Sequence, residues 1–181
     1  TEVLLKNFCG TTDIVANAYS SKKWPGSSHY SPHISATGIK NKFGDKIFNS
    51  YFKFMTVRNP WDRVVSYFFH MKAKGKHCKR YQKYKIDEFS EFVAELVGPR
   101  PRPNTGKRAS YYSWSEVDGK FILDDYIRYE NLENDTLRIL NKLNINYNNI
   151  TYPHMNTYQR KSNKHYTEYY DDETREIVAE R

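Results

Sequence analysis

Hydrophobic residues follow both strand-like and helix-like spacings along this chain of 181 residues. A near-continuous apolar run within 51–57 predicts a strand that is covered on both faces. The next stretch repeats apolar residues every three or four positions, which predicts a helix over about 60–72 with one face toward the core. The residues on that face are Trp61, Val64, Val65, Phe68 and Met71.

The same patterns predict the other elements of the fold. Further helices are expected at 1–9, at 35–43 ending at Gly44, at 87–97, at 131–144 and from about Asp171 onward, with a turn at Asp118-Gly119 and a second strand within 121–129. Strands alternate with helices, and no repeat or linker divides the chain. We therefore expect one α/β domain over 1–181, with a mainly parallel sheet flanked by helices.

The composition favours anionic partners and excludes some classes of protein. The net charge is +8, and the segment 72–85 combines many basic residues with tyrosines, which suits binding to phosphates, sugars or an acidic polymer. No apolar run approaches the roughly 18 residues of a membrane span, so no membrane segment is expected. Cys9 and Cys78 have no metal-ligand spacing with the histidines, so no metal site is predicted.

Residues 54–66 contain the pattern that points most directly to chemistry. Arg58 follows the predicted strand, at the carboxyl end where open α/β sheets bind ligands. Asn59 is a favourable N-cap, and Pro60 suits the first position of the helix. Ser66 lies off the apolar stripe of that helix. We therefore expect Arg58 and Ser66 to converge on one anion beside the helix N-terminus.

Residues 57–66, Val-Arg-Asn-Pro-Trp-Asp-Arg-Val-Val-Ser, resemble the 3′-phosphate-binding motif of sulfotransferases that use 3′-phosphoadenosine 5′-phosphosulfate (PAPS). The likeness is greatest to the carbohydrate-type, family 2 branch. It continues at 33–40, which resembles a histidine-led helix, at 125–132, which resembles the last core strand, and at 166–175, which resembles the C-terminal helix. The resemblance implies the sulfotransferase fold, a relative of the P-loop nucleotide kinases, with PAPS as co-substrate and no metal.

The resemblance also implies roles for particular residues. Arg58 and Ser66 would hold the 3′-phosphate, and Arg160 and Lys161 would contact a phosphate from a late basic loop. The alternative for Arg58 is a structural ion pair with a carboxylate such as Asp62.

The sequence offers three candidates for the catalytic base. His33 matches an upstream histidine of the resembling sequences and is the expected acceptor of the substrate's proton, with His29 and Glu2 as alternatives. The acceptor itself is expected to be a hydroxyl or amine of a carbohydrate-like, possibly anionic molecule rather than a nucleic acid.

One family signature is missing from these 181 residues. Thr1–Leu5 resembles the helix that follows the family's 5′-phosphosulfate loop, a segment of the Pro-Lys-Thr-Gly-Gly-Thr-Ser kind. We therefore expect a domain trimmed at both ends, or else a member of the family that lacks half of its donor site. The compartment is expected to be the cytoplasm for a microbial protein, with the Golgi lumen left open, and the oligomeric state is left open as well.

Two other functions were weighed against a sulfotransferase. The absence of the loop favours a non-catalytic basic module that binds nucleotides or polyanions, whereas Arg58 and Ser66 at a strand–helix junction favour the enzyme. A nucleotide kinase is disfavoured, because no Gly-x-x-x-x-Gly-Lys-Ser/Thr motif is present.

Overall fold

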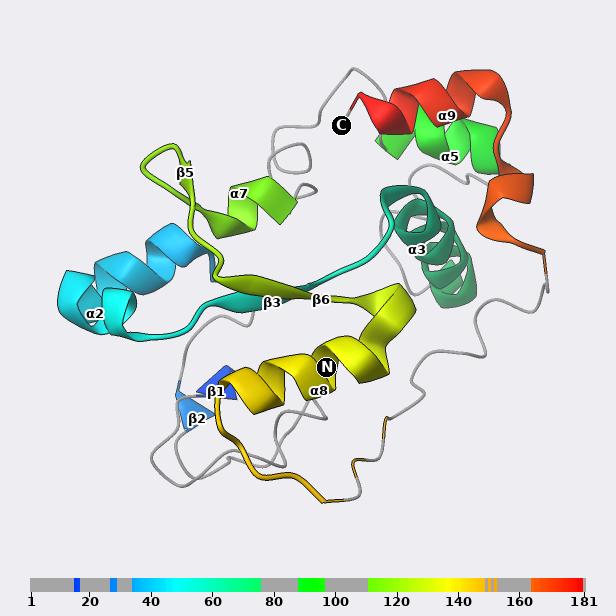
Figure 1. Ribbon diagram of the computed structural model, residues 1–181. Helices are drawn as coiled ribbons and strands as arrows, with labels where there is room; N and C mark the ends of the chain where they lie inside the picture. Colours follow the sequence, from blue (N-terminus) through cyan, green and yellow to red (C-terminus); the bar gives the residue numbers. More distant parts are fainter. Residues whose placement is uncertain are drawn as a thin grey trace. The chain divides into compact units, whose positions relative to one another are not determined.

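The computed structural model describes residues 15–16, 27–28, 34–75, 88–96, 111–148, 150, 152 and 164–180. The chain divides into two compact units, which are described one at a time (Figure 1). The first unit comprises residues 1–56, 111–127 and 131–153, and the second comprises 57–110, 128–130 and 154–181.

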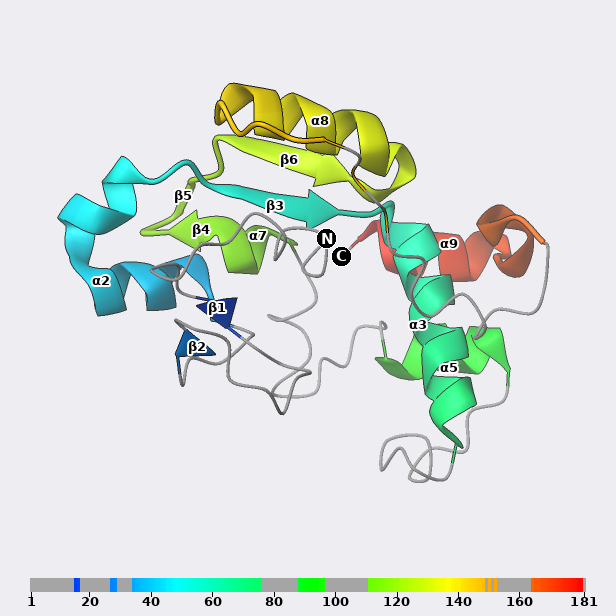
Figure 2. The same cartoon turned by 90° about the horizontal axis from the view of Figure 1, so that it is seen from below.

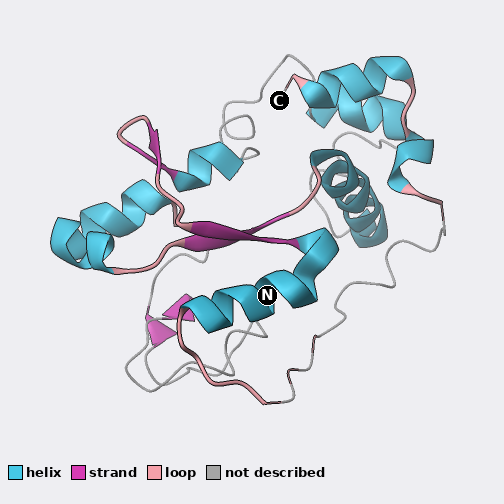
Figure 3. Cartoon of the chain, in the orientation of Figure 1, coloured by secondary structure: helices cyan, strands magenta, loops and turns pink. Residues whose placement is uncertain are grey.

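The first unit is a small α/β assembly (Figure 3). Its elements are β1 (Val15–Ala16), β2 (Ser27–Ser28), α2 (Ala36–Ser50), β3 (Phe54–Val57), α7 (Tyr111–Ser115), β4 (Glu116–Val117), β5 (Lys120–Phe121), β6 (Asp125–Arg128) and α8 (Leu132–Lys142). Strands β1 and β2 form a short parallel pair, and β4 and β5 form an antiparallel hairpin. Asp118 and Gly119 join that hairpin with φ values of 52° and 75°, which confirms the predicted turn.

Strands β3 and β6 pair with each other and run in the same direction (Figure 2). At their starting ends the backbone N–H of Asp124 donates to the carbonyl of Lys53 at 2.8 Å, and the N–H of Lys53 donates to the Asp124 carboxylate at 2.6 Å. Helix α8 lies along β6, and Ile127, Ile139 and Leu140 are almost completely buried. A mixed α/β fold with a small parallel sheet flanked by helices is therefore confirmed.

One prediction for this unit was wrong in detail, and another was confirmed. The strand expected at 51–57 is limited to β3, and its residues are half-buried rather than covered on both faces. In the described part of the chain its sheet contains only β6 as a second strand, which leaves the β3 side chains partly accessible. The helix predicted to end at Gly44 is confirmed, since the helical run that begins at Ala36 is broken at Gly44, with φ 78° and ψ 163°. A second helical stretch, which was not predicted, then continues α2 to Ser50.

The second unit is built mainly from helices. Its elements are α3 (Pro60–Lys74), α5 (Phe89–Leu96), η3 (Tyr129–Asn131), which leads from β6 into α8, η5 (Tyr166–Tyr169) and α9 (Asp172–Ala179). The predicted apolar stripe of α3 is confirmed, since it packs with α5 and α9 around one hydrophobic cluster. That cluster contains Val64, Val65, Phe68, Met71, Phe89, Phe92, Val93 and Val178, with Trp61 half-buried against it.

The start of α3 is fastened to the C-terminal elements of the same unit. The hydroxyl of Tyr170 donates to the carbonyl of Trp61 at 2.8 Å, and the indole N–H of Trp61 donates to the carbonyl of Arg175 at 3.3 Å. Asp171 caps α9 by accepting from the backbone N–H of Thr174 at 2.8 Å, which confirms the predicted start of this helix. These contacts hold in place the helix that carries Asp62 and Ser66.

Candidate functional site

Arg58 and Ser66 meet at the carboxyl end of β3. Arg58 follows the last residue of that strand, and its Nη1 donates a hydrogen bond to Ser66 Oγ at 3.0 Å. Both side chains are half-buried. The structure therefore brings together the two residues that the sequence predicts to converge on an anion.

Asp62 holds the opposite edge of the same guanidinium group. Arg58 Nε donates to Asp62 Oδ2 at 2.6 Å, and the exposed fractions of the two side chains are 22% and 13%. Asp62 and Ser66 lie four residues apart on α3, and residues at this spacing share one face of a helix. The ion pair with Asp62, which was the expected alternative to a phosphate-binding role for Arg58, is present in the structure together with the Ser66 contact.

The turn after β6 supplies a third partner for Arg58. The guanidinium carbon lies 4.2 Å from the centre of the Tyr129 ring, within the range of a cation–π contact. The neighbouring Glu130 accepts a hydrogen bond from the backbone N–H of Asn59 at 2.6 Å. One cation–π contact and one hydrogen bond therefore join the residues that follow β3 to those that follow β6.

The first amide groups of α3 are already engaged within the protein. Asn59 Oδ1 accepts from the N–H groups of Trp61 at 3.0 Å and Asp62 at 3.3 Å, and the N–H of Arg63 donates to the Asn59 carbonyl at 2.9 Å. The expectation of an anion beside the helix N-terminus is therefore refined. These three amides already have acceptors within the protein, so the expectation now concerns the side chains of Arg58 and Ser66.

The comparisons with known proteins agree with this geometry. A model of the sulfotransferase family matches residues 4–181. The chain belongs to the sulfotransferase family. An uncharacterized protein of Archaeoglobus fulgidus is 30% identical to it over 109 residues, which are 59% of this chain and 79% of that protein. No solved structure matches the chain. Membership of the family indicates a sulfuryl-transfer activity.

Several residues that the sequence assigns to the sulfotransferase site lie outside the described part of the structure. They are Arg160, Lys161, His33, His29 and Glu2. Their roles stay predictions. Over 34–75, 88–96, 111–148 and the shorter described stretches, the structure has no group of three or more His, Cys, Asp or Glu residues that could hold a metal ion. Nor does it have a helix there that is long and apolar enough to cross a membrane.

Two residues of this site were missed by the sequence reasoning, namely Tyr129 and Glu130. The signal that could have found them is their position directly after β6. The rule that ligands bind at the carboxyl ends of parallel strands applies to this strand as well as to β3. It was used for Arg58 and not extended to the second strand.

The environment of α3 also affects the pKa of a half-buried tyrosine, Tyr170. Burial, together with the nearby Asp62 carboxylate, raises the pKa of Tyr170 far above its usual value of 10.0. Its phenol therefore stays protonated at neutral pH and can donate to the Trp61 carbonyl. Through this hydrogen bond the Tyr170 side chain fastens the start of α3.

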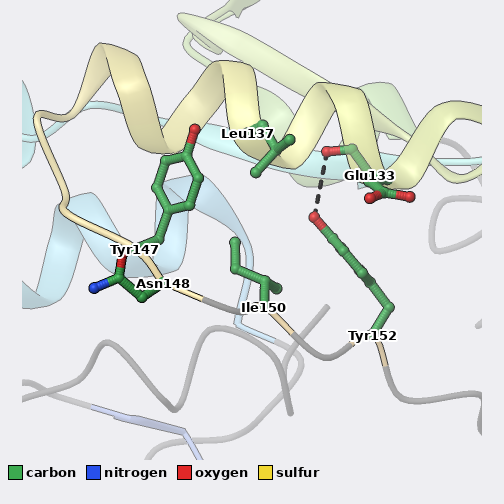
Figure 4. A pocket seen from close by; sticks show the side chains of 6 residues that line it. All are labelled: Glu133, Leu137, Tyr147, Asn148, Ile150 and Tyr152. Carbon is green, nitrogen blue, oxygen red and sulfur yellow. Dashed lines mark hydrogen bonds between the residues drawn. The ribbon is translucent and has the colours of Figure 1, made fainter.

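The first unit contains a separate hollow beside α8, with a volume of about 460 Å³ (Figure 4). It is lined by Glu133, Leu137, Tyr147, Asn148, Ile150 and Tyr152. The Tyr152 hydroxyl donates to the Glu133 carbonyl at 3.3 Å, and burial raises the pKa of Tyr152. Among the described residues, its lining contains the Glu133 carboxylate and no Lys or Arg side chain, so this hollow is less suited to a phosphate group than the site of Arg58, which supplies a cation.

Proposed function

We propose that this protein transfers a sulfuryl group from PAPS to a hydroxyl or amine of a carbohydrate-like acceptor. In this proposal Arg58 and Ser66 bind the 3′-phosphate of the donor nucleotide. The observation that carries the proposal is the 3.0 Å contact between Arg58 Nη1 and Ser66 Oγ, directly after a strand of a parallel sheet.

The donor groups at this place fit a phosphate. A guanidinium group is planar and permanently charged, and its N–H groups match the spacing of phosphate oxygens. The Ser66 hydroxyl accepts from Arg58, and a hydroxyl group can donate its own hydrogen at the same time, so Ser66 can donate to a phosphate oxygen. The two residues thus offer a cation and a neutral donor to one anion.

Binding of the 3′-phosphate would contribute to catalysis by holding the donor nucleotide in a fixed position. When PAPS is bound, its sulfuryl group is the one transferred, and adenosine 3′,5′-bisphosphate is the leaving product. Groups that hold the far phosphate fix the nucleotide, so that an acceptor oxygen can approach the sulfur in line with the departing oxygen. Arg58 and Ser66 are therefore proposed as binding residues that orient the donor.

The remaining roles are proposed for residues in parts of the chain that the structure does not describe. Arg160 and Lys161 would add positive charge near the phosphates of the nucleotide. His33 would take the proton of the acceptor hydroxyl, with His29 as the alternative base. The net charge of +8 supports an acceptor that is anionic.

The proposal is tested by measuring sulfate transfer from labelled PAPS to a panel of glycans and small phenols, with inhibition by adenosine 3′,5′-bisphosphate as a control. We expect transfer to glycans and competition between the bisphosphate and PAPS. Preference for phenols would contradict the carbohydrate assignment. Binding of the bisphosphate without any transfer would instead support a non-catalytic nucleotide-binding module.

A further inference from the structure

We infer that Asp62 and Tyr129 are positioning residues, which align the Arg58 guanidinium before a 3′-phosphate arrives. This inference rests on the proposed function, because it concerns the same phosphate site. It goes further by assigning a role in donor binding to two residues that are not themselves placed among the phosphate ligands.

The Arg58 guanidinium group is planar and is held at two of its edges. All of its N–H bonds lie in one plane, so hydrogen bonds from two different edges limit the rotation of the group within that plane. Arg58 makes them to Asp62 Oδ2 at 2.6 Å and to Ser66 Oγ at 3.0 Å. Since both acceptors lie on α3, the helix itself sets the orientation of the arginine.

The Tyr129 ring restricts the same guanidinium group from one of its faces. Hydrogen bonds within the plane do not prevent the guanidinium from tilting, but the Tyr129 ring lies 4.2 Å from its central carbon and covers one face. Tyr129 belongs to η3, and its neighbour Glu130 binds the backbone N–H of Asn59 at 2.6 Å. The ring is therefore fastened close to the residue that it supports.

An arginine that is already oriented also binds a ligand at a lower cost in conformational entropy. A free arginine side chain loses much rotational freedom when it binds a ligand, and a side chain that is already ordered loses less. Asp62 also carries a negative charge that would repel a phosphate, so its presence favours binding only through orientation. Substitution of Asp62 therefore tests the positioning role directly, because the charge of Asp62 weakens phosphate binding whereas its hydrogen bond to Arg58 strengthens it.

The experiment compares affinities for adenosine 3′,5′-bisphosphate and adenosine 5′-monophosphate in the parent protein and in variants. The ratio of the two affinities isolates the contribution of the 3′-phosphate, and a general loss of stability or of adenosine binding leaves it unchanged. We expect Asp62→Ala and Tyr129→Leu to reduce this ratio by about three- to tenfold, the scale of a lost cation–π or orienting contact.

Conservative variants separate orientation from charge. Asp62→Asn keeps an oxygen acceptor for Arg58 Nε and removes the repulsive charge, so its ratio should equal or exceed that of the parent. Tyr129→Phe keeps the aromatic face and should also match the parent. Tyr126→Leu is the control for Tyr129→Leu, since the exposed fractions of Tyr126 and Tyr129 are 48% and 49%. Asp172→Ala, at a side chain that is 98% exposed, is the control for Asp62→Ala.

The outcomes distinguish this inference from the proposed function. If the parent protein binds both nucleotides equally, the phosphate assignment of Arg58 and Ser66 is wrong. If Arg58→Ala abolishes the preference for the bisphosphate while Asp62→Ala and Tyr129→Leu retain it, the assignment stands and the positioning role is wrong. An increased ratio in both Asp62→Ala and Asp62→Asn would also overturn the role of Asp62. Should Asp62→Ala fail to fold, Tyr129→Leu decides the matter.

Discussion

The ion cluster around Asp125 allows a quantitative prediction about stability. Asp125 opens β6, the strand that leads to Tyr129 and Glu130, and its side chain is only 8% exposed. Arg138 and Lys142 of α8 both bind its carboxylate, and Arg138 Nη2 also donates to the Tyr126 carbonyl at 2.7 Å. The cluster therefore fastens α8 to the beginning of β6.

The hydrogen bond from Arg138 is the largest cause that lowers the pKa of Asp125, from 3.8 to about 2, with further contributions from Lys142 and the Tyr126 N–H. A lowered pKa in the folded state means that the carboxylate contributes stability above pH 3.8, and that this contribution is lost as the pH falls toward 2. The difference corresponds to about 2 kcal/mol of the free energy of unfolding.

The substitution Asp125→Asn keeps the shape of the side chain and removes its charge. We expect the free energy of unfolding to fall by about 2 kcal/mol at pH 7, because the attraction to Arg138 and Lys142 is lost. The difference between parent and variant should shrink as the pH is lowered below 3.8. Denaturant titrations followed by circular dichroism at pH 7, 5, 4 and 3 measure both quantities.

A control at the surface is provided by Asp45, which is 75% exposed and lies 3.7 Å from Lys40 Nζ. Asp45→Asn should change the free energy of unfolding by less than about 0.5 kcal/mol, as is usual for exposed ion pairs. The reasoning about Asp125 is refuted if its variant loses under about 0.5 kcal/mol at pH 7. It is also refuted if the loss is the same at pH 3 as at pH 7.

Two further predictions concern a backbone turn and the catalytic base. Gly44→Ala should lower the free energy of unfolding by about 1–3 kcal/mol in denaturant titrations, because φ 78° and ψ 163° are strained for alanine, although the added carbon meets nothing within 4 Å beyond its chain neighbours and the helix's own backbone. A free energy of unfolding within about 0.5 kcal/mol of that of the parent would contradict this account. His33→Ala should lower the turnover of sulfate transfer by about 10²–10⁴ with nearly unchanged nucleotide affinity. Parent-like turnover in steady-state assays would shift the role of base to His29 or Glu2.

Local signals in the sequence were sufficient to predict helix α3, which carries Asp62 and Ser66. Asn59, Pro60 and the apolar spacing of the following helix predicted where α3 begins and which face is buried, because capping and periodicity depend on neighbouring residues. The convergence of Arg58 and Ser66 followed from the same spacing, since both belong to one strand–helix junction. These features need no knowledge of distant parts of the chain.

Features that depend on distant residues were not predicted. Tyr129 and Glu130 lie about seventy positions from Arg58 and Asn59, and their contacts arise only because β6 pairs with β3. The return of α2 to helical geometry after Gly44 was missed because a glycine at positive φ ends many helices but can also form a kink within one. Pairing of strands and continuation after a glycine are decided by tertiary packing, which single-sequence patterns do not contain.

The most direct test of the phosphate site is a calorimetric titration of the parent protein and Arg58→Ala with adenosine 3′,5′-bisphosphate and adenosine 5′-monophosphate. Arg175→Ala, at a surface arginine on α9 that is 58% exposed, is the charge-matched control. We predict that the parent and the control bind the bisphosphate more tightly than the monophosphate. Arg58→Ala should weaken bisphosphate binding by about 2–4 kcal/mol and remove the preference. Equal affinity of the parent for the two nucleotides, or an unchanged preference in Arg58→Ala, would contradict the assignment of Arg58 and Ser66 to the 3′-phosphate.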